Sequence, residues 1–341
     1  DLCQPIAELI KNSAAKIMVA EAHFIDFEHQ IVRTDKSDLP YDYLVLAVGS
    51  RTNFFSVPGA EAHSLVLENT SDSAKICQQI TANAALAQTT AEQDLKRKLL
   101  TSVIVGAGPT GAELAVKINQ LLGKIKPPNL TDQSKTYVIE KAGELFPALP
   151  KRLRVGAAAI LKREGVSLIA GVNVVKVGAD YLELAGRQRL EAKNIIWAAG
   201  VKPVLPDLSD CLQMGSTGRI LVDNYLRVRG HKNVFALGDV ASFQNTTGET
   251  LPSLAQVAIK QSRYVARNIV HLVVDEPLEV FDYKLLGLLI PLGHHRGVGK
   301  LLGLNISGPL VRLAVNAAYI KGYPLFKNKL KLSARLVRPR F

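Results

Sequence analysis

The stretch SVIVGAGPTGAEL, residues 102–114, constrains the fold more than any other part of the chain. An apolar run, typical of a buried strand, breaks into three glycines and resumes with helical spacing. In such a turn Gly106 allows the tight bend, Gly108 lets backbone amides approach a pyrophosphate, and Gly111 lets the helix pack close to the strand. The unpaired N–H groups at the start of the helix then face the phosphates. The pattern predicts a strand–turn–helix unit that binds a dinucleotide.

An acidic residue, Glu140, ends the next predicted strand, TYVIE. A carboxylate in this place can accept hydrogen bonds from ribose hydroxyls, and it favours NADH because it would repel the 2′-phosphate of NADPH. Its distance from Gly111 exceeds the usual spacing of about 20 residues, and the loop GKIKPPNLTDQSK accounts for the excess. Lys141 beside it weakens the preference for NADH. A glycine turn without a ligand is the alternative.

Further apolar runs alternate with helical segments along the chain. The predicted strands are YDYLVLAVGS, VSLIA, NIIWAAG, GRILVD and NVFALGD, and helical spacing covers 71–99, 111–122 and 150–164. Such alternation predicts an α/β fold with mainly parallel sheets wound on both faces. Because 341 residues are too many for one typical core, we expect more than one domain.

The composition argues against several other kinds of protein. Cys3, Cys77 and Cys211 lie far apart and never as CxxC, which argues against a disulfide framework, a zinc site and a dithiol centre. The longest apolar stretches fall short of the roughly 20 residues that a membrane-spanning helix needs. Adjacent histidines at 294 and 295 point to different sides of a strand, and no third ligand is near in sequence. We expect no metal site.

A second carboxylate follows a buried strand in NVFALGDVAS at 233–242. The pair Gly238–Asp239 would lie at the carboxyl edge of a sheet, where ligands of open α/β folds bind. Alone, Asp239 could instead cap a helix that begins near Pro252, or stabilise a turn. YDYLVLAVGS and the WAAG stretch at 197–200 also end apolar runs in glycine, so the three stretches form a recurring pattern along the chain.

The order YDYLVLAVGS, GAGPTGAEL, IIWAAGVKP, NVFALGD resembles the two-dinucleotide flavoprotein reductases, and the likeness covers most of the chain. Within that superfamily the chain is most similar to the type II NADH:quinone oxidoreductases. That similarity rests on SRTNFFSVPG, GAGPTGAEL, LAQVAIKQSRYVARN and the ending AVNAAYIKGYPLFKNKLKL. It implies a FAD-dependent enzyme that passes electrons from NADH to a quinone.

The resemblance also implies two Rossmann-like, doubly wound dinucleotide-binding domains. We expect residues 1–69 and 219–282 to bind FAD, 70–218 to bind NADH, and 283–341 to form a basic amphipathic segment. Asp239 would bond the FAD ribityl chain, and Ala255 and Gln256 would lie beside the isoalloxazine ring. The expected cofactor-binding residues are Gly49, Gly106, Gly108, Gly111, Glu140, Ala199, Gly200, Gly238, Asp239, Ala255 and Gln256.

The expected catalytic residues are Glu113, Gln256, Lys260 and Gln261. Glu113 matches a glutamate that in the family lies near the nicotinamide and the flavin, and a first-turn acid favoured by the helix dipole is the alternative. The family pattern Ala-Gln-x-Ala-x-Gln has Lys260 at its sixth place here, with Gln261 one step on. One helical position rotates a side chain by about 100°, so Gln261 need not replace the family's glutamine. Lys260 could itself donate a hydrogen bond to a quinone carbonyl.

The family's first glycine turn, which binds the FAD pyrophosphate, would precede Asp1. We therefore expect the sequence to begin inside a longer product, and we expect the chain as written to bind FAD poorly.

The net charge of +12 is concentrated at one end of the chain. Residues 283–341 hold 11 of the 42 Lys and Arg residues and none of the 30 Asp and Glu residues. The stretch 309–320 is apolar apart from Arg312 and Asn316, which share a helix face. After Pro324 apolar and basic residues fall on separate sides, as in helices that lie on anionic membranes at about 1 kcal/mol per basic residue. The alternative is a charged face packed on the protein's own core.

We therefore expect a peripheral membrane protein, on the cytoplasmic face of a bacterial inner membrane or on an organelle membrane. Its partners would be a quinone and, through 309–341, anionic lipids, with a homodimer as a candidate assembly. Nucleic acid is disfavoured because no aromatic residues interleave the cations for base stacking. Two rivals are a soluble flavin reductase of a small redox protein and a flavin-less, NADH-binding protein that docks on membranes.

Overall fold

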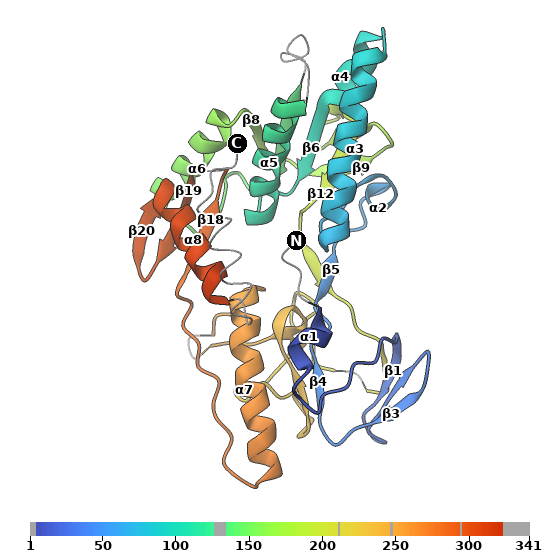
Figure 1. The fold of residues 1–341 in the computed structure, drawn as a ribbon, viewed down its shortest axis with the longest axis vertical. Helices are drawn as coiled ribbons and strands as arrows, with labels where there is room; N and C mark the ends of the chain where they lie inside the picture. Colours follow the sequence, from blue (N-terminus) through green and yellow to red (C-terminus); the bar gives the residue numbers. More distant parts are fainter. Residues whose placement is uncertain (1–4, 126–133, 211, 246–247, 294, 323–341) are drawn as a thin grey trace. The chain divides into compact units, whose positions relative to one another are not determined.

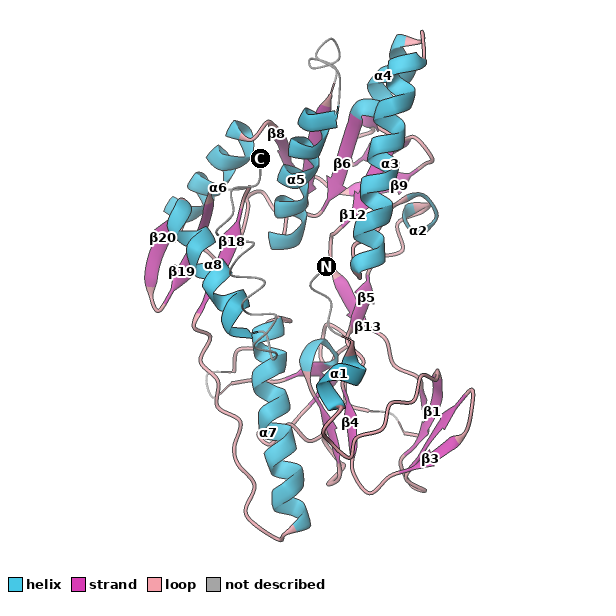
Figure 2. Ribbon diagram, viewed as in Figure 1, coloured by secondary structure: helices cyan, strands magenta, loops and turns pink. Residues whose placement is uncertain are grey.

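The computed structural model describes residues 5–125, 134–210, 212–245, 248–293 and 295–322 (Figure 1). These residues divide into two compact units, each built from separate segments of the chain. Unit 1 contains Thr52–Gly200 and the described residues from Leu286 onward, and unit 2 contains Ile6–Arg51 and Val201–Leu285. Both units combine helices with strands (Figure 2), so the expected α/β class is confirmed.

Unit 1 is centred on a parallel sheet with the strand order β12-β6-β7-β8. Its strands are β6 (Thr101–Val105), β7 (Lys135–Glu140), β8 (Val166–Ala170) and β12 (Asn194–Trp197). Every residue of β6 and β12 is buried, which explains why the sequence shows uninterrupted apolar runs rather than alternation.

The two faces of this sheet are covered differently. Ile104, Val138 and Ile196 share a buried cluster with residues of α3 (Thr70–Thr89), α5 (Pro109–Ile125) and α6 (Lys151–Arg163). Val103, Ile139 and Ile195 share another with the antiparallel strands β9 (Val174–Val177) and β10 (Tyr181–Leu184). The third strand of that small sheet is β11 (Arg189–Glu191). The second face is thus covered by antiparallel strands instead of the expected helices.

The helical stretch expected over 71–99 is two helices, α3 and α4 (Gln93–Leu100). Helix α3 begins with a capping box, in which Asn69 and Asp72 each bind the backbone of the other. The break falls at the consecutive β-branched residues Thr89 and Thr90, and Thr90 has an extended backbone.

The described part of the basic end is folded into unit 1 and is not a separate segment. It forms an antiparallel sheet of β18 (Gly287–Pro291), β19 (Gly297–Leu301) and β20 (Leu304–Ser307), followed by α8 (Pro309–Gly322). Ile290, Leu292 and Val298 are fully buried in the same cluster as α5 and α6. Helix α8 buries Val311 and Val315 on one face and exposes Leu310 and Leu313 on another. The amphipathic pattern expected after Pro324 lies outside the described residues.

Unit 2 is built from short strands and one long helix. Its elements are α1 (Ile6–Ile10), β1 (Ala22–Asp26), β2 (Ile31–Thr34), β3 (Asp38–Pro40), β4 (Leu44–Leu46), β13 (Val201–Pro203), β14 (Asp207–Leu208), β15 (Ile220–Leu221), β16 (Val234–Ala236), η2 (Gly238–Val240), β17 (Ala241–Ser242) and α7 (Ala255–Val273). Strands β4 and β16 pair in parallel, and Phe235 of β16 is fully buried. The strand expected at 41–50 is limited to β4.

The boundaries between the units differ from the expected domain boundaries at 70 and 219. Residues 52–69, which include part of β5 (Ser50–Thr52) and all of α2 (Ala60–His63), belong to unit 1. The reason is packing, since Ala60 is fully buried beside Val177 and Trp197, and Leu65 bridges to Ile196. Residues 201–218 belong to unit 2, where β14 extends the sheet of β1.

Candidate functional site

The glycine turn of unit 1 joins β6 to α5 and has the expected geometry. A side chain at Gly106, where φ is +99°, would place its Cβ 2.4 Å from the Cα of Ala199. A Cβ on Gly111 would lie 1.9 Å from the carbonyl oxygen of Gly106. A Cβ on Gly108 would meet nothing within 4 Å. Two of the glycines are therefore required by the protein's own packing, and the third faces open space, as a turn that receives a pyrophosphate requires.

The half-buried carboxylate of Glu140, at the end of β7, braces this turn. One oxygen accepts a hydrogen bond from the N–H of Ala107 at 2.9 Å, and the other accepts one from the N–H of Ala142 at 2.9 Å. A carboxylate oxygen can accept two hydrogen bonds, so each retains capacity for a ribose hydroxyl. The same negative charge would oppose a 2′-phosphate.

A pocket of about 560 Å³ opens at this carboxyl edge of the sheet. Its polar lining includes Glu140, Lys141 and Asn173, and its apolar lining includes Phe55, Val57, Pro58, Val172, Val174, Val175, Trp197 and Ala199. Mostly apolar walls with few polar groups are typical of small-molecule sites of this size. The residues present therefore fit the adenosine half of a dinucleotide.

Ala199 and Gly200 follow β12 at the same edge. The carbonyl oxygen of Gly200 accepts a hydrogen bond from the N–H of Asn53 at 2.9 Å. Trp197 donates its indole N–H to the carbonyl oxygen of Asn53 at 2.9 Å. These bonds fasten the 53–57 turn beside the WAAG stretch.

In unit 2 the carboxyl ends of β4 and β16 carry the second carboxylate. Ser50 donates its hydroxyl to Asp239 at 2.7 Å, and Gln261 accepts the N–H of Gly238 at 2.8 Å. The interpretation of Asp239 as a helix cap is wrong, because α7 begins after Leu254 and has no side-chain cap. Gly49 has a φ of +69°, and a Cβ there would meet nothing within 4 Å. Asp239 and the open backbone at Gly49 fit a flavin nucleotide, from whose hydroxyl groups a carboxylate would accept hydrogen bonds.

Helix α7 carries the remaining predicted residues of unit 2. Ala255 and Gln256 are exposed in its first turn, whose N–H groups receive no side-chain cap. Tyr283 donates its hydroxyl to the side-chain oxygen of Gln256 at 3.3 Å, and burial raises the pKa of that hydroxyl. Lys260 is half-buried, with its ammonium 5.4 Å from the ring centroid of Tyr264. The side chain of Gln261 is turned inward and is only 2% exposed.

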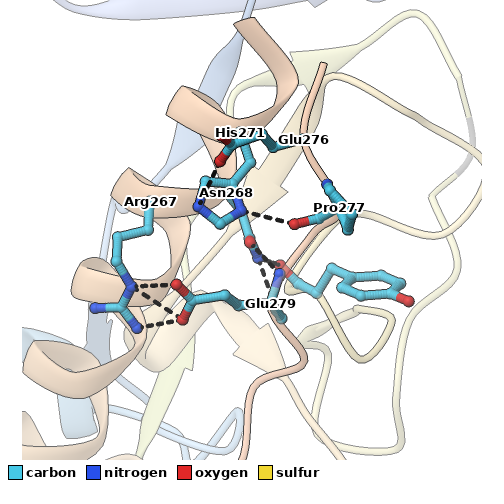
Figure 3. Close-up of polar contacts among 7 residues, drawn as sticks. Arg267, Asn268, His271, Glu276, Pro277 and Glu279 are labelled. Carbon is cyan, nitrogen blue, oxygen red and sulfur yellow. Dashed lines mark hydrogen bonds and ion pairs between the residues drawn. The ribbon is translucent and has the colours of Figure 1, made fainter. Parts of the chain in front are cut away.

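Helix α7 is fastened near its carboxyl end (Figure 3). Arg267 forms a bidentate ion pair with Glu279, and these hydrogen bonds hold the pKa of the Glu279 carboxyl below its ordinary value. Asn268 is fully buried and makes two hydrogen bonds with the backbone of Glu279, at 2.8 and 3.0 Å. The ring of His271 contacts the carbonyl oxygen of Pro277 at 2.7 Å. These contacts fix the axis of the helix that carries Gln256, Lys260 and Gln261.

Glu113 is the fifth residue of α5, which begins at Pro109. The interpretation as a first-turn acid is therefore wrong, because the dipole effect is confined to the first turn. Its carboxylate instead forms an ion pair with Lys117 at 2.9 Å, one helical turn on, and its side chain is 27% exposed.

The model of the family described as pyridine nucleotide-disulphide oxidoreductase matches residues 3–262. The chain belongs to this family. It is 29% identical over 350 aligned positions to a demethylphylloquinone reductase of Synechocystis, covering 99% of this chain and 82% of the relative. It is 28% identical over 318 positions to a type II NADH:quinone oxidoreductase of Staphylococcus aureus, covering 90% of this chain and 77% of that one. The resemblance stated from the sequence is thereby confirmed.

Solved structures support the same fold for this pyridine nucleotide-disulphide oxidoreductase. The structure of NDH2 from Plasmodium falciparum in complex with NADH superposes with a TM-score of 0.86 at 17% identity, covering 93% of this chain and 82% of that chain. Among the described residues of the chain, no group of three or more His, Cys, Asp or Glu side chains could hold a metal ion. His294 lies outside those residues.

The sequence did not predict several residues that the structure places beside the candidate site residues of unit 1 and unit 2. Phe55 lines the pocket of unit 1, Ser50 binds Asp239, and Tyr283 binds Gln256. Phe55 and Ser50 lie within SRTNFFSVPG, a stretch that carries the resemblance but has no local pattern that shows which distant residues it contacts. Tyr283 begins the segment that the sequence assigned to the basic end, so no sequence signal linked it to α7.

Proposed function

We propose that this chain is a FAD-dependent NADH:quinone oxidoreductase. The observation that carries the proposal is the glycine turn of unit 1 with Glu140 in its pocket, which fits NADH. The named relatives, a demethylphylloquinone reductase and a type II NADH:quinone oxidoreductase, support a quinone as the acceptor. When bound, FAD supplies the redox chemistry, in which it takes a hydride from NADH and passes two electrons on.

In unit 1 the protein binds and orients NADH. The open backbone at Gly108 and the positive end of the dipole of α5, which begins at Pro109, receive the pyrophosphate. The carboxylate of Glu140 accepts hydrogen bonds from the ribose hydroxyls and from the N–H of Ala107. One side chain therefore orients both the ligand and the glycine turn. Ala199 and Gly200 bound the same site from β12. Glu113 is proposed to act near the nicotinamide, with its charge balanced by Lys117.

In unit 2 the protein holds the flavin. Asp239 accepts hydrogen bonds from the ribityl hydroxyls, and Ser50 fixes the orientation of its carboxylate. Gln261 holds Gly238 and is therefore a positioning residue rather than a group that touches substrate. Ala255 and Gln256 lie at the start of α7, whose positive end favours negative charge beside it.

Gln256 and Lys260 supply the polar groups for the quinone. The ammonium of Lys260 is a hydrogen-bond donor toward a quinone carbonyl, and the ring of Tyr264 holds it in place. Lys260→Gln restores the family pattern and should retain quinone reduction, whereas Lys260→Ala should raise the KM for quinone about tenfold. Equal KM values for all three proteins would rule out this role of Lys260.

We also propose binding to the surface of an anionic membrane. Leu302 and Leu304 at the turn between β19 and β20, and Leu310 and Leu313 on α8, are each at least 62% exposed. Lys300 and Arg312 lie in the same elements, and 283–341 contain no acid. Among the described residues no helix has the length and apolar character needed to cross a membrane. The proposed location is the cytoplasmic face of a bacterial inner membrane or an organelle membrane.

Cosedimentation with liposomes tests the membrane proposal. The chain should bind vesicles that contain anionic lipid and bind zwitterionic vesicles weakly. Replacing Leu302 and Leu304 by Ser should weaken binding without changing NADH binding, while Val155→Ala on the exposed face of α6 is the control. If the double variant Leu302→Ser, Leu304→Ser binds anionic vesicles as well as the wild type does, this surface is not the membrane contact. Light scattering of the protein without liposomes tests the homodimer, for which the expected mass is twice that of the chain.

The decisive experiment is NADH oxidation with added FAD and a quinone in anionic liposomes, with the flavin spectrum recorded in parallel. Bleaching of the flavin by NADH and recovery on addition of quinone are the expected results. Reduction of a small redox protein but not of quinone would favour the soluble reductase instead. NADH binding without any flavin signal would favour the flavin-less, NADH-binding protein.

A further inference from the structure

The turn that carries Phe54 and Phe55 directs its two aromatic rings to different surroundings. Phe54 packs against Trp197 with ring centroids 5.8 Å apart, in the buried cluster of unit 1. Phe55 is 58% exposed although it lines the 560 Å³ pocket. A large apolar ring left exposed at the rim of a pocket is a feature that core packing does not explain.

The backbone holds the Phe55 ring in this place. Phe55 and Ser56 have φ angles of +49° and +55°, a region that residues with a side chain rarely adopt in succession. The side-chain oxygen of Asn53 accepts a hydrogen bond from the N–H of Phe55 at 2.9 Å. The N–H of Val57 donates to the carbonyl oxygen of Phe54 at 3.0 Å. Strained backbone of this kind clusters at ligand sites.

The ring is aimed across the carboxyl edge of the sheet. Its Cζ lies 3.0 Å from the position that a Cβ on Gly200 would occupy, so the ring lies close to Gly200 at the end of β12. The same pocket contains Glu140, the acceptor for a ribose hydroxyl of the adenosine half. The ring therefore belongs to the part of the site that receives adenosine rather than nicotinamide.

We propose that the Phe55 ring stacks on the adenine of bound NADH. The proposal rests on the proposed function, because it takes this pocket as the NADH site. Purine rings have flat, polarisable faces for which an aromatic side chain is a suitable partner, and removing such a partner weakens binding measurably. Since adenine is remote from the transferred hydride, the contact is expected to show in the affinity for any ligand that contains adenosine.

Titration with NADH and with ADP-ribose, which lacks the nicotinamide, tests the proposal. Phe55→Ala should raise the Kd for both ligands about tenfold, and Phe55→Trp should retain the wild-type Kd because it keeps a flat ring. Val155→Ala, outside the pocket, is the control. Near-ultraviolet circular dichroism and thermal unfolding establish that each variant is folded, and Phe55→Leu repeats the test with a smaller change of volume.

Three outcomes would overturn parts of the scheme separately. Equal Kd values for the wild type and both Phe55→Ala and Phe55→Leu would eliminate stacking. A loss of affinity for NADH but not for ADP-ribose would overturn the placement of adenine. Failure of the wild type to bind either ligand would instead contradict the NADH site itself.

Discussion

The two glycine-containing turns at the carboxyl edges of the sheets are held in place by different means. In unit 1 the turn after β6 is fixed by close packing of backbone, because a Cβ on Gly106 or Gly111 would overlap main-chain atoms of Ala199 or of Gly106 itself. In unit 2 the turn after β16 is fixed by side chains, since Gln261 holds the N–H of Gly238 and Ser50 holds Asp239. One turn therefore depends on the absence of side chains, and the other depends on specific side chains.

The difference predicts how each turn fails. Overpacking a close-packed interior costs more than the net loss of one hydrogen bond. Substitutions at Gly106 or Gly111 should therefore lower the stability of unit 1 strongly and abolish NADH binding. Substitutions in the unit 2 turn should weaken it by graded amounts.

The largest effect is expected for Gly111→Ala. Its Cβ would lie 1.9 Å from the carbonyl oxygen of Gly106, so we expect a loss of about 3 kcal/mol in the free energy of unfolding, together with loss of NADH binding. Urea denaturation and NADH titration measure both. Gly123→Ala on the same helix meets nothing within 4 Å and should stabilise by about 0.5–1 kcal/mol. A Gly111→Ala protein as stable as the wild type would break the comparison.

The next largest effect is expected for Gln261→Leu. The substitution keeps the volume of the buried side chain but leaves the N–H of Gly238 without its acceptor, which should cost about 2 kcal/mol. Denaturation measures this cost, and hydrogen exchange of the Gly238 amide localises it. The exposed Gln88→Leu on α3 is the control, and an equal effect of the two changes would remove Gln261 from the positioning role.

A smaller effect is expected for Ser50→Ala, which removes the hydroxyl that binds Asp239. We expect a cost of about 1 kcal/mol in unfolding and a several-fold weaker affinity for FAD, because the carboxylate loses its fixed orientation. Ser50→Thr should restore both. If Ser50→Thr and Ser50→Ala behave alike, the hydroxyl is not what orients Asp239.

The smallest effect is a pH dependence confined to unit 2. Arg267 lowers the pKa of the Glu279 carboxyl below its ordinary 4.5, so the ion pair stabilises unit 2 above pH 4.5. That contribution is lost as the pH falls through the lowered folded pKa. Glu279→Gln should therefore flatten the acid dependence of amide protection in α7, measured by hydrogen exchange. The Gly106–Gly111 turn should show no change, and a steeper acid dependence in Glu279→Gln would contradict the sign.

The contrast also explains which parts of the site were predictable from the sequence. The unit 1 turn can be predicted from one short stretch, because the three glycines and the adjoining parts of the strand and the helix lie within 13 consecutive residues. The unit 2 turn cannot, because Ser50 and Asp239 are 189 positions apart and only the fold brings them together. The family pattern points to Gln261 only as the neighbour of Lys260, and the contact of Gln261 with Gly238 depends on how α7 is rotated.

The basic end shows a second limit of sequence reasoning. Its charge indicates a membrane segment, but the described part contains short apolar runs bounded by glycines, GLLIP at 287–291 and GVGKL at 297–301, which form antiparallel strands. Apart from Leu292, the other buried members of the core that contains Ile290 and Val298 all lie at Ile196 or earlier in the chain. Such long-range burial has no local pattern of its own.

The division of unit 2 between two distant segments has a consequence for how the protein is made. Strand β4 leaves the ribosome early, but its partner β16 is synthesised only after the whole of Thr52–Gly200. Until then the unpaired edge of Leu44–Leu46 is a template for wrong pairing with other chains. Because chains emerge at about 5–20 residues per second, this exposure lasts on the order of ten seconds or more. We expect the nascent chain to depend on chaperones that shield this edge until β16 arrives.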